Sequence, residues 1–180
     1  MNKQNTEIKK LVTAGVCLAL CMLLPFVTMQ IPEIGSALSP MHIPVLLCGL
    51  ICGWPYGLVV GFVAPVLRFL IFGMPPIFPT GLAMAFELAA YGTISGILYR
   101  MLPKKLPSLY LSLIAAMLCG RIVWGIVSLI LLNISGGAFT FMAFLTGAFI
   151  NAVPGIICHI IVIPLLVLAV QKAGFMLNTD

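Results

Sequence analysis

Long runs of apolar residues, separated by short stretches rich in Pro, Gly and polar residues, dominate the pattern of the chain. A helix needs about 20 mostly apolar residues to cross the roughly 30 Å hydrocarbon core of a bilayer. We therefore expect membrane-spanning helices at 11–29, 56–72, 80–99, 109–132 and 141–170. The last range contains Pro154 and Pro164, which are expected to kink it because proline removes a backbone donor and clashes with the preceding turn.

A further apolar stretch, 42–53, is too short to cross a bilayer in the usual way. It leads into Gly53-Trp54-Pro55-Tyr56-Gly57, in which the glycines and the proline indicate a turn. The stretch forms either a short helix or one half of a re-entrant hairpin, and the sequence leaves both alternatives open. Counting it as a crossing predicts an all-α integral membrane protein of six transmembrane helices, with residues 1–180 in a single domain.

Composition supports a location in the membrane. The chain has 180 residues, of which 62% are hydrophobic, and its 9 basic and 4 acidic side chains amount to 7% charged residues. A soluble domain carries roughly 25% charged residues, so a soluble fold is excluded because too little polar surface is present to cover it. The net charge of +5 does not indicate nucleic-acid binding, because the basic residues are few and scattered.

The positions of the basic residues predict which side of the membrane each loop faces. Lys and Arg concentrate in the cytoplasmic loops of membrane proteins. Here they lie in the stretch 1–10, around 100–105, and at Lys172 near the carboxyl end. The opposite loops contain none: 31–41, 73–79 and 133–140. The pattern predicts that both termini are cytoplasmic, that 1–10 is a basic cytoplasmic tail, and that the other three loops face outward.

The types of residue present exclude several kinds of chemistry. Asp180 is the only aspartate, so aspartate-based proteases, magnesium sites and phosphorylated pumps lack their central residue. No Gly-x-x-x-x-Gly-Lys-Ser/Thr motif occurs, so the chain has no phosphate-binding loop for ATP. The 6 cysteines lie in apolar runs and are interpreted as small apolar side chains rather than as a disulfide framework. We expect no metal site and no cofactor in this chain.

Three charged residues fall inside the predicted spans, where burying a charge costs about 2.5–3.5 kcal/mol and therefore indicates function. They are Arg68, Glu87 and Arg121, and the polar residue Asn151 lies at a comparable depth. Counted from the outer ends of the predicted helices, Arg68 lies about one turn deep and the others about two to three turns deep. These side chains predict a cavity that opens outward rather than a pore across the bilayer.

Helical spacing predicts which neighbours line this cavity. Tyr91 shares a helix face with Glu87, and Trp124 shares one with Arg121. His42, at the outer start of 42–53, is either a contact in a lid or an interfacial residue. The candidate substrate-binding residues are therefore Arg121, Glu87, Asn151, Arg68, His42, Tyr91 and Trp124. No catalytic residue is assigned, and His159 is interpreted as a core residue because it lies nearer the cytoplasmic side.

The charge balance of these candidates favours an acidic ligand. Arg68 and Arg121 together outweigh Glu87 by one positive charge, and a guanidinium group suits a carboxylate. Two alternatives stay open: Glu87 clamps both arginines in a structural role, or Arg68 extends to the membrane interface. An unmatched positive charge in apolar surroundings favours a small molecule that bears a carboxylate.

The first predicted helix offers small residues at Ala14, Gly15 and Ala19. Gly15 and Ala19 form a small-x-x-x-small pattern, which lets another helix approach closely. The pattern fits either packing within the same bundle or an interface with a partner protein.

Several segments give the chain a family resemblance over nearly its whole length. The first, 38–57, contains Ser-Pro-Met-His-Ile-Pro and Gly-Trp-Pro-Tyr-Gly. The second, 73–100, contains Gly-Met-Pro-Pro-Ile-Phe-Pro, Phe-Glu-Leu-Ala-Ala-Tyr-Gly and Leu-Tyr-Arg. With the basic amino terminus and the small-residue first helix, these segments resemble the substrate-binding S component of an energy-coupling factor (ECF) vitamin transporter. They look most like members assigned to pantothenate.

The resemblance implies a bacterial, multi-pass protein of the cell membrane that binds a vitamin on its outer side with high affinity. It also implies that the loaded protein associates with a transmembrane scaffold subunit and two ATPase subunits, which use ATP, and then reorients to release the vitamin inside. In that family the first helix docks on the scaffold through an Ala-x-x-x-Ala motif, for which this chain has Gly15 and Ala19.

Two other functions remain as alternatives. A self-sufficient secondary transporter would use Glu87 to couple transport to protons, but such proteins commonly consist of repeated halves, and the sequence has no such symmetry. An intramembrane enzyme would use Glu87 or His159 as a base. It would also need a nucleophile or a metal partner in the same leaflet, and no spacing in the chain supplies one.

Overall fold

The computed structural model describes residues 3–28, 39–137 and 139–178, and in these ranges the chain is helical and contains no strand. The elements are α1 (Lys3–Thr28), α3 (His42–Cys52), α4 (Trp54–Phe72), the π-helical turn η1 (Ile77–Gly81), α5 (Leu82–Met101), α6 (Leu106–Ile134), α7 (Phe141–Leu145), the π-helical turn η2 (Thr146–Ile150) and α8 (Val153–Lys172).

Five helical stretches are long and apolar enough to cross a membrane: Gln4–Phe26, Trp54–Phe72, Ile77–Met101, Leu106–Ile134 and Phe141–Lys172. The helix α3 is a shorter apolar helix. The predicted all-α fold and the five long apolar helices are thus confirmed, and the count of six crossings stays a prediction.

The helices extend beyond the predicted spans. α1 begins at Lys3, so most of the predicted basic tail 1–10 is the first part of this helix. α6 continues to Ile134, into the predicted loop 133–140. Hydropathy detects only the part of a helix that favours lipid, whereas a helix can continue into water with polar residues on its surface. The predicted loop 31–41 lies mostly outside the described residues.

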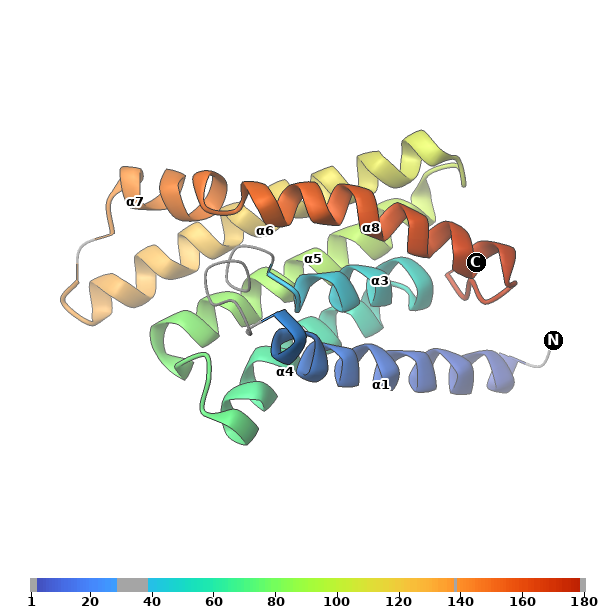
Figure 1. The fold of residues 1–180 in the computed structure, drawn as a ribbon, viewed down its shortest axis with the longest axis horizontal. Helices are drawn as coiled ribbons and strands as arrows, with labels where there is room; N and C mark the ends of the chain where they lie inside the picture. Colours follow the sequence, from blue (N-terminus) through green and yellow to red (C-terminus); the bar gives the residue numbers. More distant parts are fainter. Residues whose placement is uncertain (1–2, 29–38, 138, 179–180) are drawn as a thin grey trace.

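The long helices lie side by side and alternate in direction along the bundle (Figure 1). Both chain ends and the turn between α5 and α6 lie at one end of the bundle, and the turns after α4 and α6 lie at the other. The helix α5 packs against α3, α4 and α6, while α1 lies on α3 and α4, and α8 contacts α3 and α6. The basic residues near the two termini and in the α5–α6 turn are therefore gathered at one end.

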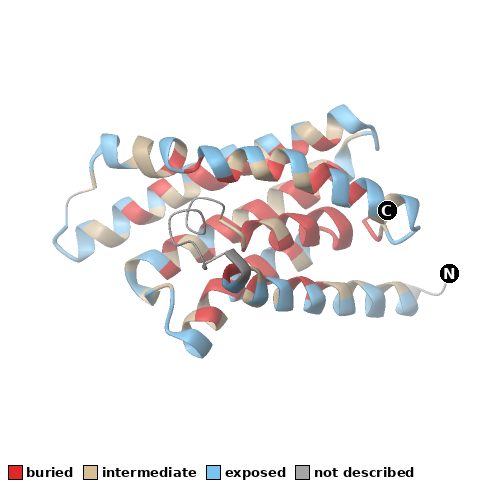
Figure 2. Cartoon of the chain, in the orientation of Figure 1, coloured by how far each residue is buried: buried red, intermediate tan, exposed pale blue. Residues whose placement is uncertain are grey.

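The short helix α3 forms the centre of the core. All of its residues are buried except Ile43, which is half-buried, and Figure 2 shows buried residues concentrated on α3 and on the inward faces around it. Neighbouring helices rather than lipid cover it, so this helix of 11 residues does not need to match the thickness of the bilayer. Of the two alternatives for the stretch 42–53, a short helix or half of a re-entrant hairpin, the structure has the short helix. The helix ends where Gly53 adopts a φ of 99°, which begins a sharp turn into α4.

Glycines bring α3, α4 and α5 into close contact. A Cβ atom added to Gly57 of α4 would lie 2.5 Å from the Gly92 carbonyl oxygen of α5 and 2.8 Å from the Gly49 Cα atom of α3. A larger side chain at this crossing would force a backbone to move. The crossing fixes the register between α3 and α5, and both helices carry residues of the candidate site.

The cysteines of α1 and α3 act as small core side chains. Cys17 and Cys21 of α1 and Cys48 and Cys52 of α3 are free thiols, and all four are buried. The Cys21 thiol donates to the Met41 carbonyl oxygen at 3.6 Å, just before α3. Their positions agree with the interpretation of these residues as small apolar side chains.

The last predicted span, 141–170, is divided into α7, η2 and α8. The regular α-helix is interrupted at 151–152, directly before Pro154, where a kink was expected, although both residues keep right-handed helical backbone angles. Pro164, in contrast, lies inside α8, which continues through it. This interruption separates the aromatic part of the span, in α7 and η2, from the part that carries His159.

The segment after α8 folds back onto the end of the bundle where the chain termini lie. The Leu177 N–H donates to the Ile51 carbonyl oxygen (3.0 Å), and the amide of the buried Asn178 donates to the Gly96 carbonyl oxygen (3.1 Å). Lys104, in the turn between α5 and α6, donates to the Asn178 carbonyl oxygen (3.2 Å). These contacts tie α3, α5 and the end of the chain together.

Candidate functional site

Four ionisable side chains from four helices meet in the interior of the bundle. They are His42 at the start of α3, Glu87 of α5, Arg121 of α6 and His159 of α8, and all four are buried. We call this group the polar cluster. Apolar side chains of the core surround it, so it forms a small polar region in an apolar interior.

Arg121 and Glu87 form a buried ion pair within the polar cluster. Arg121 Nη1 lies 3.0 Å from Glu87 Oε1, and the two side chains are 10% and 2% exposed. Removing two charges from water is unfavourable unless each compensates the other. The two residues therefore depend on one another, and the pair joins the neighbouring helices α5 and α6.

His42 lies between the ion pair and the residues that precede α3. Its Nε2 atom is 3.6 Å from Glu87 Oε1, and its Nδ1 atom is 3.1 Å from the Ser39 carbonyl oxygen. The same carbonyl accepts a hydrogen bond from the His42 N–H (3.0 Å), which holds Ser39 against the start of the helix. His42 is only 3% exposed, so the interfacial alternative for this residue does not hold.

Two further rings complete the surroundings of His42. The His159 ring is stacked on it, with centroids 5.8 Å apart and an interplanar angle of 24°, and the Tyr91 ring lies 5.1 Å away. Tyr91 follows Glu87 by one turn on the same face of α5, as the spacing predicts. Gly120 of α6 leaves room for the tyrosine ring, because a Cβ atom there would lie 2.0 Å from two ring carbons.

Several buried polar atoms of the cluster have no hydrogen-bond partner among the described residues. They include Arg121 Nε, His42 Nε2 and His159 Nε2. Buried polar groups are nearly always paired with protein, water or ligand. The cluster therefore offers donors and acceptors that a small molecule can satisfy. Within the described ranges, no three His, Cys, Asp or Glu side chains are placed to hold a metal ion.

His159 is the member of the cluster that sequence reasoning assigned to core packing alone. The structure brings it against His42 because α8 packs on α3, and the two rings stack at this contact. One signal in the sequence favours it: an ionisable residue in a membrane span is a functional candidate by default.

The structure does not bring Arg68 to the polar cluster. Its guanidinium donates to the Met22 carbonyl oxygen of α1 (3.1 Å) and lies 5.1 and 5.5 Å from the ring centroids of Phe26 and Phe72. The hydrogen bond and the two aromatic rings offset part of the cost of placing this charge among apolar side chains. Arg68 therefore ties α4 to the end of α1, and the expectation that it shares a cavity with Glu87 is not supported.

Asn151 and Trp124 also lie outside the polar cluster. Asn151 is exposed at the break between η2 and α8. Trp124 is half-buried, and its ring centroid lies 5.9 Å from that of Phe139 and 6.4 Å from that of Phe144. A Cβ atom added to Gly147 would lie 2.7 Å from the Trp124 ring, so the glycine makes room for it. Trp124 thus belongs to an aromatic group near α7 and lies outside the polar cluster.

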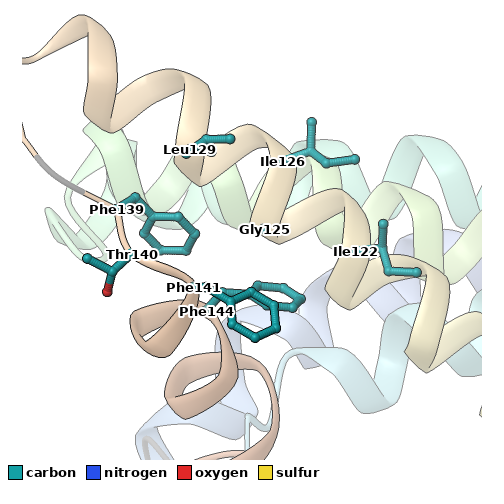
Figure 3. Close-up of a pocket in the computed structure, with 8 residues that line it drawn as sticks. All are labelled: Ile122, Gly125, Ile126, Leu129, Phe139, Thr140, Phe141 and Phe144. Carbon is teal, nitrogen blue, oxygen red and sulfur yellow. The ribbon is translucent and has the colours of Figure 1, made fainter.

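A groove of about 420 Å³ lies between α6 and α7, beside this aromatic group (Figure 3). It is lined by Ile122, Gly125, Ile126, Leu129, Phe139, Thr140, Phe141 and Phe144. Figure 3 shows rings from the α7 side facing the α6 helix across the groove. Thr140 supplies the only side-chain oxygen in this lining, so the groove suits apolar atoms. The polar cluster is the better candidate for binding a polar ligand.

The small residues of α1 face two directions. Gly15 and Ala19 are exposed, and a Cβ atom added to Gly15 would meet no atom within 4 Å. Ala14 is buried against the core, so it belongs to internal packing and not to an outer docking surface. The exposed face of α1 also carries large apolar side chains: Leu11, Val12, Val16, Leu23 and Phe26. We call this surface the α1 face.

Comparison with known proteins gives one match. A family model described as ECF transporter, substrate-specific component, matches residues 9–167. The matched range includes all four residues of the polar cluster, as well as Gly15 and Ala19. Searches of curated proteins and of solved structures gave no significant match.

Proposed function

Because the chain belongs to the family of ECF transporter substrate-specific components, we propose that it binds a small vitamin with high affinity in the membrane. The complete transporter then takes up the vitamin in an ATP-driven step. This family consists of transporter components and is not an enzyme family. The best candidate for the ligand is pantothenate or another vitamin that bears a carboxylate.

The polar cluster is the observation that carries this proposal. Small-molecule sites are mostly apolar pockets in which a few fixed polar groups orient the ligand. Arg121 Nε supplies a free donor for a carboxylate, and His159 Nε2 supplies a group for a hydroxyl or an amide. Pantothenate carries a carboxylate, an amide and hydroxyl groups, so its polar atoms match this set.

The proposed ligand site comprises Arg121, Glu87, His42 and Tyr91, with His159 added from the structure. Glu87 holds Arg121 and faces His42, so it orients the groups that contact the ligand. Arg68, Asn151 and Trp124 are left out, because their contacts place them elsewhere in the fold.

The family implies a membrane scaffold subunit and ATPase partners in general terms. We propose that the α1 face is the surface that docks on the scaffold, with Gly15 and Ala19 at the closest approach. Small exposed residues spaced by four positions allow a partner helix to approach closely. ATP hydrolysis belongs to the partners, since this chain has no phosphate-binding loop.

The proposed orientation places both termini in the cytoplasm of a bacterial cell and counts six crossings of the cell membrane. The gathering of the basic segments at one end of the bundle supports it (Figure 1). The helix α3, with 11 residues, is about 16 Å long, so it is the crossing that depends on its neighbours for cover.

Isothermal titration calorimetry with the purified chain in detergent tests the ligand. Panthenol, in which an alcohol replaces the carboxylate of pantothenate, is the matched control. We expect pantothenate to bind at least about tenfold more tightly, because a hydrogen bond to a charged group contributes about 1.5–3 kcal/mol. If a native mass spectrum shows a different co-purified vitamin, that vitamin takes the place of pantothenate as the proposed ligand, and the proposed role in uptake stays. Transport by the purified chain without partners would overturn that role.

A further inference from the structure

The two ring nitrogens of His42 each face an oxygen atom that accepts hydrogen bonds. Nδ1 is 3.1 Å from the Ser39 carbonyl oxygen, and Nε2 is 3.6 Å from Glu87 Oε1. A carbonyl oxygen cannot donate, and a carboxylate that is paired with Arg121 is ionised and cannot donate either. Both neighbours of the ring are therefore acceptors.

A neutral imidazole has only one N–H group, so it can satisfy only one of these two oxygens. If Nδ1 carries the hydrogen, the Nε2 lone pair faces the carboxylate of Glu87. If Nε2 carries it, the Nδ1 lone pair faces the Ser39 carbonyl. Only the imidazolium form donates to both oxygens, and the 3.6 Å separation leaves room for a small movement that forms the second hydrogen bond.

The titratable and charged groups near His42 can be followed helix by helix. Among the described residues, Arg121 of α6 and Glu87 of α5 cancel each other, and the titratable rings of Tyr91 (α5) and His159 (α8) lie beside His42. On α1, the Cys21 thiol donates to the carbonyl of Met41, the residue before His42. The charged residue of α4, Arg68, is turned away toward α1.

With a neutral His42, the polar cluster has no net charge. An anionic ligand that enters this buried region would bring an uncompensated charge into an apolar interior, which is strongly unfavourable. A proton on His42 gives the cluster a net charge of +1, which one carboxylate neutralises. The two remaining free groups, Arg121 Nε and His159 Nε2, are then available to contact the anion.

We propose that His42 is a proton-binding residue, and that the site takes up one proton from water for each anionic vitamin it binds. The inference rests on the proposed function and adds a pH-dependent control of affinity to it. The added proton leaves an N–H group on both ring nitrogens of His42, so that Nδ1 donates to Ser39 and Nε2 donates to Glu87, and no covalent bond to the ligand forms or breaks. By linkage, the proton and the anion favour each other's binding equally.

Calorimetry of the wild-type chain tests this coupling without any substitution. Pantothenate and panthenol are titrated in phosphate and in Tris, whose ionisation enthalpies differ, so the difference in heat reports protons taken up. We expect about one proton per pantothenate and none per panthenol. Above the range in which free His42 is protonated, the Kd of pantothenate should rise about tenfold per pH unit, the slope for one linked proton.

His42→Gln supplies the variant test, because its neutral amide keeps a donor near Glu87 but cannot gain a proton. We expect it to bind pantothenate more weakly, with no proton uptake and a flat pH profile. His159→Gln changes another residue of the ligand site, so it should also weaken binding, but each pantothenate bound should still take up one proton. Gel filtration and circular dichroism verify that both variants are folded.

Each outcome separates the two proposals. Pantothenate binding without proton uptake, or proton uptake that persists in His42→Gln, overturns this inference and leaves the proposed function standing. If pantothenate, biotin and nicotinate all fail to bind a folded wild-type chain, the proposed carboxylate ligand is overturned, and the inference falls with it.

Discussion

Arg121 Nη1 lies 3.0 Å from Glu87 Oε1, and both side chains of this ion pair are buried in the bundle. The other pair between formally charged groups there, Lys10 with Glu7, is exposed. The buried pair joins α5 to α6 at the level where His42 and His159 converge. It therefore connects the stability of the bundle to the chemistry of the site.

Removing one partner of this pair should destabilise the fold strongly. We expect Arg121→Gln or Glu87→Gln to lower the free energy of unfolding by about 3–5 kcal/mol, because each leaves an uncompensated buried charge. The double variant Arg121→Gln/Glu87→Gln should recover much of that loss. Chemical denaturation in mixed detergent micelles measures the three variants. Additive losses in the double variant would contradict the paired arrangement.

Ligand affinity should respond differently from stability. In the same double variant we expect the affinity for pantothenate to stay about 1.5–3 kcal/mol weaker than in the wild type, the contribution of a hydrogen bond to a charged group. The two glutamines leave no buried charge, so the fold is stable again. The Arg121 guanidinium that is proposed to bind the carboxylate of the ligand is nevertheless absent. Calorimetry at one pH measures the change. A double variant that is both stable and fully competent in binding would remove Arg121 from the proposed site.

The space beside Tyr91 gives a sharper steric prediction. A Cβ atom at Gly120 would lie 2.0 Å from two ring carbons of Tyr91, so Gly120→Ala must displace the ring or separate α5 from α6. We expect a loss of about 1–3 kcal/mol in stability, typical of overpacking, and weaker ligand binding. Gly15→Ala is the matched control, since no atom lies within 4 Å of its added Cβ. Equal melting temperatures for the two variants would contradict the tight contact.

The buried amide after α8 should stabilise the opposite end of the bundle. Asn178 donates to the Gly96 carbonyl at 3.1 Å and lies 3.5 Å from the Gly49 carbonyl. Asn178→Ala leaves these oxygens without their donor, so we expect a loss of about 1–3 kcal/mol. Asn178→Asp should cost more, because its carboxylate presents only acceptors to those carbonyls. Thermal unfolding at neutral pH measures both, and an unchanged Asn178→Ala midpoint would contradict the prediction.

The apolar pattern was sufficient to predict the five long apolar helices, because a span requires a length of apolar sequence that few other structures need. It could not predict where the helices end, since Lys3 and Ile134 extend theirs beyond the apolar runs. Nor could it show that the short helix α3 is central. That position depends on tertiary glycine contacts such as Gly49 of α3 with Gly92 of α5.

The members of the polar cluster, the candidate site, were predicted only in part, and the reason is geometric. Counting residues along a helix gives depth in the membrane but not the direction in which a side chain points. Glu87 and Arg121 shared both depth and direction, whereas Arg68 had a suitable depth but faces α1. His159 was assigned to the core because it was counted as lying nearer the cytoplasmic side, and its depth along the helix could not show that its ring stacks on His42.

The division of small residues on α1 gives the last prediction. Gly15 and Ala19 are exposed, whereas Ala14 is buried, so substitutions by leucine should have different effects at neighbouring positions. Gly15→Leu/Ala19→Leu should abolish assembly with the scaffold and ATPase subunits while ligand binding and stability stay near wild type. The added side chains block close approach of a partner helix but meet free space in the chain alone.

Co-purification with the partner subunits measures assembly, and calorimetry measures binding. Ala169→Leu on α8 is the matched control, an exposed small residue on another helix that should leave assembly intact. Ala14→Leu should instead lower stability, because overpacking a filled core typically costs about 1–3 kcal/mol. Assembly that survives the double leucine variant would place the docking surface elsewhere. Loss of ligand binding together with assembly would show that α1 supports the fold of the site, since its Cys21 contacts the residue that precedes His42.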